Sequence, residues 1–126
     1  MTTTPEHPIV WAEIPVTDIA ASRRFYEEVL QTKMVTEDGA PNPMFNFVAA
    51  TPAGVAGHIY PGKPAERGAG PTIHLACPDG LEATLERVKT AGGEVVSDTI
   101  AIPPGRFAYC HDPDGNSIGM FELAAV

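Results

Sequence analysis

The sequence predicts an α+β fold of two tandem βαβββ modules, which form a curved mixed β-sheet trough with the helices on the outside. Two observations predict this fold. An apolar strand that ends in an aspartate is followed by a helical stretch twice, at Val16-Thr17-Asp18 and, about 60 residues later, at Cys77-Pro78-Asp79. Several short apolar runs, separated by Gly and Pro, follow each helical stretch. We expect the functional site in the cleft between the two copies.

The first copy begins with a β-branched and aromatic run, residues 9–16, which is typical of a strand. Asp18 is suited to cap the helix predicted over residues 19–31, in which apolar side chains recur at spacings of three and four. Further strands are predicted over residues 32–36, 44–50 and 55–60, with a break at Glu37-Asp38-Gly39.

The second copy repeats this order after a stretch rich in Gly and Pro. The predicted elements are a strand at 72–77, a helix at 81–91, a strand at 94–98, a proline-containing loop at 100–105, and a hairpin of 106–111 and 117–123. The segment Asp112-Pro113-Asp114-Gly115-Asn116 is predicted to form the turn of this hairpin. Proline fixes φ at one position, and Gly or Asn tolerates a positive φ. We therefore expect one domain over residues 1–126, with module 1 at about 7–61, a linker at 62–71 and module 2 at about 72–124.

Composition excludes several classes of partner. The chain has 126 residues, of which 44% are hydrophobic, and a formal net charge of −8, which disfavours nucleic acid and anionic membrane surfaces. No apolar run has the length of a membrane span, and no basic segment followed by an apolar run marks a secretory signal. Cys77 and Cys110 lack CxxC spacing and are expected to be reduced, packed thiols, which favours a cytoplasmic location.

Three segments together resemble the vicinal oxygen chelate superfamily, the group of glyoxalases, bleomycin resistance proteins and extradiol dioxygenases. These segments are IPVTDIAASRRFYEEVL, LACPDGLEATLERVKTAGGEVV and RFAYCHDPDGNSIGMFEL, and they extend over nearly the whole chain. The start at Trp11-Ala12-Glu13-Ile14-Pro15-Val16 and the end at residues 107–116 are especially similar to a small glyoxalase-like subgroup. The resemblance implies a homodimer that binds a small molecule.

The resemblance also raises the question of a metal site. Metal-using members hold a divalent ion (Zn, Ni, Mn or Fe) with three or four inward-facing His and Glu side chains. The corresponding positions here fall on Trp11, on Ile73 with His74 beside it, and on Gly119, so only His58 fits a ligand position. Glu122 lies three residues beyond Gly119 and is therefore expected on the opposite face of its strand. No metal is favoured, and the alternative ligand set is His58, His74 and Glu122.

Glu13 is the candidate catalytic residue, because it shares a strand face with Trp11 and a carboxylate in a partly apolar pocket suits acid/base work. The alternative is a structural Glu at a dimer contact or bonded to a neighbouring strand. The residues expected to bind a ligand in the trough are Trp11, Glu13, Phe45, Phe47, His58, Phe107 and Tyr109. If Ile73 lines the trough, His74 points toward the helix; a shift of one residue reverses the two.

The predicted function is binding of a small apolar or aromatic metabolite in the trough without a complete metal site, with metal-independent acid/base chemistry from Glu13. One alternative is a metal-dependent lyase, isomerase or dioxygenase of the glyoxalase or extradiol type. Another is a resistance protein that sequesters an antibiotic, as bleomycin resistance proteins do. The sequence leaves open whether the protein is an enzyme, and it does not name the ligand.

Overall fold

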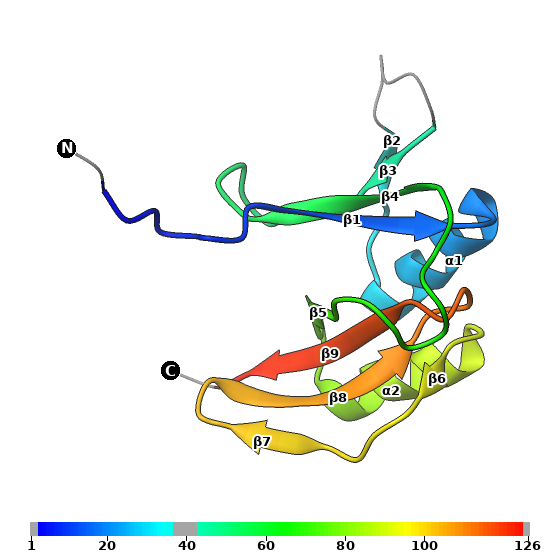
Figure 1. The fold of residues 1–126 in the computed structure, drawn as a ribbon. Helices are drawn as coiled ribbons and strands as arrows, with labels where there is room; N and C mark the ends of the chain where they lie inside the picture. Colours follow the sequence, from blue (N-terminus) through cyan, green and yellow to red (C-terminus); the bar gives the residue numbers. More distant parts are fainter. Residues whose placement is uncertain (1–2, 37–42, 125–126) are drawn as a thin grey trace.

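The computed structural model describes residues 3–36 and 43–124. Within these ranges the chain forms two α-helices and two mixed sheets, which confirms the predicted α+β class. Figure 1 shows the two sheets one above the other, with both helices gathered at the same end of the molecule. Neither helix has the length and hydropathy needed to cross a bilayer.

Module 1 forms a four-stranded sheet with one helix. Its elements are β1 (Trp11–Val16), α1 (Ile19–Leu30), β2 (Val35–Thr36), β3 (Phe45–Asn46) and β4 (Ala56–Pro61). The strand order is β1-β4-β3-β2, with β1 parallel to β4 and the other pairs antiparallel. The strands β2 and β3 are shorter than predicted, and the predicted break at residues 37–39 lies outside the described residues.

Module 2 repeats this topology. Its elements are β5 (Ile73–Ala76), α2 (Leu81–Thr90), β6 (Glu94–Val95), β7 (Ile100–Ile102), β8 (Gly105–His111) and β9 (Ser117–Leu123). The order β5-β9-β8-β6 is that of module 1, and β7 adds to β8. The prediction of a loop at 100–105 is thus wrong for residues 100–102, which form β7. Both prolines lie in the turn between β7 and β8, where they interrupt no hydrogen bond between the strands.

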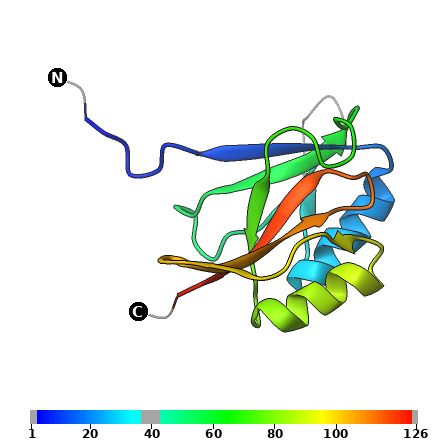
Figure 2. The same ribbon diagram turned by 60° about the horizontal axis from the view of Figure 1, so that its bottom comes forward.

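One hydrophobic core serves both modules. Strand residues that face the helices, such as Ile14 and Ile59 in module 1 and Ile118 and Met120 in module 2, belong to one buried cluster with Phe25, Tyr26, Val29, Leu81 and Val88 of the helices. In the turned view of Figure 2, α1 and α2 again lie side by side, and the two helices contact each other. Each sheet therefore has a helix-covered face and an opposite face, which we call its helix-free face.

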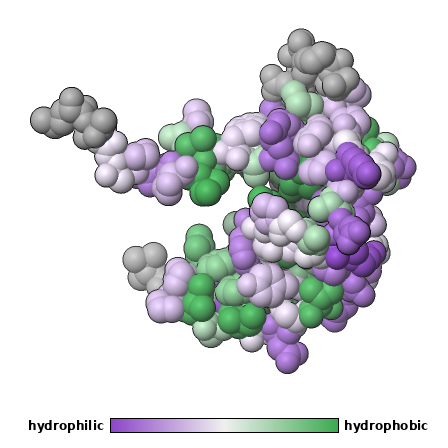
Figure 3. Space-filling model, in the orientation of Figure 1, coloured by the Kyte–Doolittle hydropathy of each residue, from purple (hydrophilic) through white to green (hydrophobic). Residues whose placement is uncertain are grey.

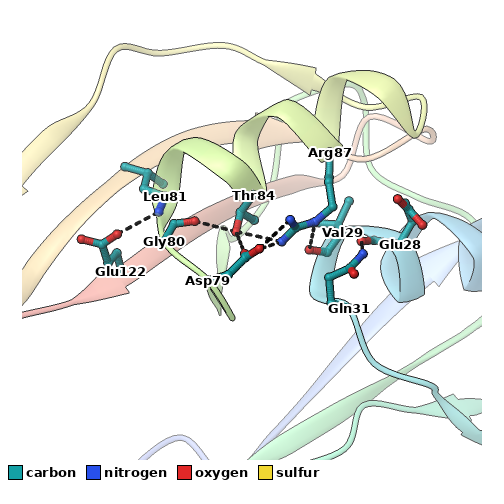
Figure 4. Close-up of polar contacts among 9 residues, drawn as sticks. All are labelled: Glu28, Val29, Gln31, Asp79, Gly80, Leu81, Thr84, Arg87 and Glu122. Carbon is teal, nitrogen blue, oxygen red and sulfur yellow. Dashed lines mark hydrogen bonds and ion pairs between the residues drawn. The ribbon is translucent and has the colours of Figure 1, made fainter.

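Hydrogen bonds at one end of the sheets connect the two modules. The buried Asp112 accepts a hydrogen bond from the Tyr26 hydroxyl of α1 at 2.6 Å, and the Asn116 side chain donates to the carbonyl of Pro15 at 2.8 Å. On the helix side, the Nε of Arg87 donates to the carbonyl of Val29 at 3.2 Å (Figure 4). These contacts fix β1 relative to β9 and therefore position the helix-free faces.

Candidate functional site

Strand alternation and register decide which side chains reach the helix-free face of module 1. Ile14 and Val16 are buried on the helix side, so Trp11, Glu13 and Pro15 point the other way. The register of the parallel β1–β4 pair sets Glu13 beside His58. Two residues later on β4, Tyr60 lies on the same face, and its ring meets His58 edge to face at 5.8 Å.

Three of these side chains form a chain of polar contacts. The indole Nε1 of Trp11 donates to Nδ1 of His58 at 2.9 Å, and Nε2 of His58 lies 3.3 Å from Oε1 of Glu13. An indole nitrogen only donates, so Nδ1 must accept and the neutral ring carries its proton on Nε2, toward the carboxylate. The His58 side chain is 10% exposed and that of Glu13 is 66% exposed. The chain thus presents an ordered carboxylate to the surface.

An aromatic cluster occupies the helix-free face of module 2. The His74 ring lies 4.9 Å from Phe107, 5.6 Å from Phe121 and 5.9 Å from Tyr109. Phe107 and Phe121 are stacked at 5.5 Å with an interplanar angle of 10°. Desolvation lowers the pKa of His74, which favours its neutral ring. We call these four residues the ring cluster.

Gly119 makes the ring cluster possible. It pairs with His74 in the β5–β9 register, and a Cβ at position 119 would lie 2.2 Å from Nδ1 of the His74 ring. Only glycine leaves room for an imidazole in that position. The position at which the resemblance implies a metal-ligating carboxylate is therefore filled by the side chain of a neighbouring strand.

A small cavity lies at the seam between the sheets. Its volume is about 150 Å³, and its lining includes Glu13 from β1, Ile73 from β5 and Ile118 from β9. Figure 3 shows a wider hollow between the N-terminal segment and the second sheet, with apolar surface on both sides. A larger groove of about 810 Å³ runs along α1 beside Ala91 and Pro113, and none of the predicted site residues lines it.

Two predicted ligand-binding residues do not reach the helix-free face. Phe45 pairs with the buried Ile59, and Arg23 of α1 lies over its ring at 4.4 Å. The Phe47 ring contacts Tyr26 at 5.4 Å, also on the core side. Their predicted place in the trough is wrong, because the register of β3 against β4 turns Asn46 toward His58 instead.

The alternative metal-ligand set does not converge either. Glu122 lies on the helix side, where it accepts from the backbone N–H of Leu81 at 2.8 Å and pairs with Arg106 at 2.9 Å. His74 lies on the helix-free face, while Ile73 packs on the core, which decides between the two orientations that the sequence left open. Across residues 3–36 and 43–124, no three His, Cys, Asp or Glu side chains are grouped so as to hold a metal ion. Within these ranges, the side chains of one chain therefore offer no donor set that fits a divalent ion.

The two cysteines face the core rather than the site. Cys110 is buried, and burial raises the pKa of its thiol to about 11. Burial also raises the pKa of Cys77. Both are free thiols, and neither is disposed to act as a thiolate nucleophile at neutral pH.

Sequence reasoning placed Trp11, Glu13, His58, Phe107 and Tyr109 among the ligand-binding residues, and all five reach the helix-free faces. It left out Tyr60, His74 and Phe121. Strand alternation could have indicated Tyr60 and Phe121, because they lie two residues after His58 and Gly119 and so share a face with them. His74 required the register of β5, which the short strand does not encode.

The fold and these faces define a class: small α+β proteins of paired βαβββ modules, with the helices on one side of the sheets and site residues on the other. The family model described as the Glyoxalase/Bleomycin resistance protein/Dioxygenase superfamily matches residues 8–120, and the chain belongs to that superfamily. This result confirms the resemblance inferred from the three motif segments.

Individual relatives agree with this assignment. A "Glyoxylase-like domain-containing protein" from Didymella fabae is 29% identical over 115 residues, which cover 83% of this chain and 85% of that protein. A glyoxalase/bleomycin resistance protein from Albidiferax ferrireducens superposes with a TM-score of 0.72 at 23% identity, over 92% of this chain and 98% of the other. The fosfomycin resistance protein FosX from Listeria monocytogenes gives 0.64 at 16% identity, over 98% and 96%. At these identities the two structures support the fold alone.

Proposed function

We propose that the protein binds a small planar aromatic molecule on its helix-free faces. The observation that carries this proposal is the ring cluster, in which His74, Phe107, Tyr109 and Phe121 contact one another on a face that no helix covers. Tyr109 is 37% exposed, so an aromatic surface is accessible there. Aromatic side chains bind planar ligands by stacking and edge-to-face contact, and binding sites are usually lined by such rings with a few polar groups.

The test is a screen of aromatic fragments followed by a variant pair. Tyr109→Ala removes an accessible ring from the ring cluster and should weaken binding by about tenfold, which is the upper range for one aromatic contact. Thr90→Ala shortens an exposed side chain of α2, on the helix side of the sheet, and should leave the affinity unchanged. Equal affinities for both variants would count against the ring cluster as the binding surface.

Metal-independent acid/base chemistry is a second candidate function, and the Glu13–His58 contact favours it. His58 holds the carboxylate of Glu13 while most of that side chain stays exposed, as a general base must be to reach a substrate proton. Once a turnover is found, Glu13→Gln should abolish it while the affinity for uncharged aromatic fragments is retained. Unchanged turnover in Glu13→Gln would remove Glu13 from the mechanism.

The proposal includes a homodimer. Ile9 and Val10 of the N-terminal segment are 73% and 67% exposed, and Leu123 at the end of β9 is 70% exposed. Apolar side chains this exposed are typical of surfaces that become buried on association. Light scattering should report a dimer mass for the protein and a monomer for an Ile9→Asp, Val10→Asp variant; a monomeric mass for the unaltered protein would refute this part.

A further inference from the structure

We infer that the aromatic ligand carries a positive charge, and that Glu13 binds its cationic group. The inference rests on the proposed aromatic binding and deepens it.

The strands that the structure describes contribute no basic side chain to the faces that would receive the ligand. From the linker, Arg67 contacts His111 at the end of β8 and pairs with Glu94 at 3.6 Å. Along the nine strands of the described ranges, the one Lys or Arg is Arg106. Arg106 points to the helix side, where its guanidinium pairs with Glu82 at 2.6 Å and Glu122 at 2.9 Å. A phosphonate, sulfonate or carboxylate ligand would therefore meet no cation on these strands, whereas such groups are bound by Arg and Lys.

Glu13 supplies the opposite charge on the same surface. Because the Trp11 indole can only donate a hydrogen bond, Nδ1 of His58 is the acceptor and the neutral ring carries its proton on Nε2. This Nε2–H group donates to the carboxylate of Glu13, which is the hydrogen-bond acceptor in this contact. The contact with His58 involves Oε1, and the side chain is still 66% exposed, so an ammonium group has access to it.

The rings around Glu13 also suit a cation. Trp11 and Tyr60 lie on the same face, each about 5.8 Å from the His58 ring. Tryptophan and tyrosine faces attract ammonium groups through their quadrupoles. A carboxylate flanked by such rings would bind an organic ammonium ion better than a neutral or anionic group of the same shape.

Glu13 also lies close enough to the second sheet for one ligand to contact both surfaces. It lines the 150 Å³ seam cavity together with Ile73 and Ile118. Ile73 and Ile118 face the core, so the residues that follow them, His74 and Gly119, lie on the helix-free face of the same two strands. A small aromatic ammonium ion at the seam can place its charge at Glu13 and its ring against the edge of the second sheet.

The test uses three compounds that share a phenyl ring and differ in charge: phenethylammonium, 2-phenylethanol and phenylacetate. Trp11 is the only tryptophan of the chain, so its fluorescence reports events beside Glu13. We expect phenethylammonium to bind about fivefold more tightly than the alcohol, the size of one partly exposed ion pair, and phenylacetate to bind most weakly. Added salt should reduce the preference for the cation.

A matched pair of variants assigns the effect. Glu13→Gln should make phenethylammonium and 2-phenylethanol bind equally, while Glu86→Gln, which removes the same charge from the exposed side of α2, should keep the preference. Equal affinity of the unaltered protein for all three compounds, or a preference that survives Glu13→Gln, would overturn the cationic ligand and leave aromatic binding standing. If none of the compounds binds, the proposed function fails with it.

Discussion

The two modules share one topology, yet their helices begin in different ways. In module 1, Asp18 directly precedes α1 and accepts a hydrogen bond from the backbone N–H of Ala21 at 3.1 Å. In module 2 the residue directly before α2 is Gly80, which has a φ of +99° and no side chain that could accept a hydrogen bond. Glu122 of β9 caps α2 instead, through the N–H of Leu81 (Figure 4). One helix is thus capped by its own sequence and the other by a strand that comes later in the chain.

This difference extends to the other polar contacts of α2. Arg87 binds both carboxylate oxygens of Asp79, at 2.9 and 2.6 Å, and also the carbonyl of Val29 in module 1 (Figure 4). Arg106 of β8 pairs with Glu82 in the first turn of α2. The start of α2 therefore depends on β8 and β9, and its remainder is tied to α1. We conclude that the N-terminal cap of α2 depends on a tertiary contact, whereas that of α1 is local.

The strongest way to break this arrangement is to remove the buried carboxylate between the modules. Asp112 receives hydrogen bonds from the Tyr26 hydroxyl, the Asn116 side chain and two backbone N–H groups. We expect Asp112→Ala to cost about 4 kcal/mol of unfolding free energy, because these buried donors lose their acceptor. Denaturant unfolding measures it. Asp98→Ala, at an exposed loop position, should cost less than about 0.5 kcal/mol, and comparable losses would refute the role of Asp112.

The next largest effect is expected in the ring cluster of module 2. Gly119→Ala would push a methyl group into the His74 ring, and we expect a loss of about 2 kcal/mol from overpacking. In a His74→Ala background the same substitution should cost much less, because the space is then open. A double-mutant cycle measured by denaturant unfolding checks the coupling. Additive losses would show that Gly119 is required for a reason other than His74.

The sequence was sufficient to predict the fold because the two modules repeat strongly local signals. The Asp18 cap, the apolar spacing of α1 and the Asp112–Asn116 turn each act within a few residues, so their pattern is visible without a structure. The loop at residues 100–102 was wrong because prolines suggested a break, although they lie beyond the strand. What the sequence did not show was the Glu122 cap of α2, since a capping residue on a distant strand leaves no local pattern.

The site was predicted in part for the same reason. Alternation correctly put Glu13 with Trp11 and put Glu122 on the face opposite Gly119. Alternation fixes which residues share a face, however, and not which face meets the helices. Phe45 and Phe47 share a face as expected, but their pairing with β4 turns them to the core. For the four-residue strand β5, the choice between Ile73 and His74 depended on register with β9.

A smaller effect would sharpen the comparison of the two helix starts. Asp18→Ala should cost about 1 kcal/mol, the usual value for a lost helix cap. Glu122→Ala should lower the unfolding free energy by more than this, because it removes the α2 cap and a partner of Arg106 together. Helix-resolved hydrogen exchange should then show faster opening of the first turn of α2 only. If Asp18→Ala proves the more harmful change, the two modules do not differ as we argue.

The smallest expected effect concerns the two histidines of the helix-free faces. His58 has polar partners on both ring nitrogens, whereas His74 is surrounded by rings that lower its pKa by desolvation. A histidine whose pKa is lower in the folded protein binds fewer protons there than in the unfolded chain. Its contribution to the free energy of unfolding is therefore complete above about pH 6.5 and is lost as the pH falls below that value. We therefore expect stability to decline between pH 7 and 5, and His74→Phe, which keeps a ring without a titrating group, to flatten that decline.

The exposed His7 serves as the control, because His7→Phe should leave the slope unchanged. An unchanged slope in His74→Phe would mean that the ring cluster does not hold its histidine neutral, and that the acid sensitivity arises elsewhere.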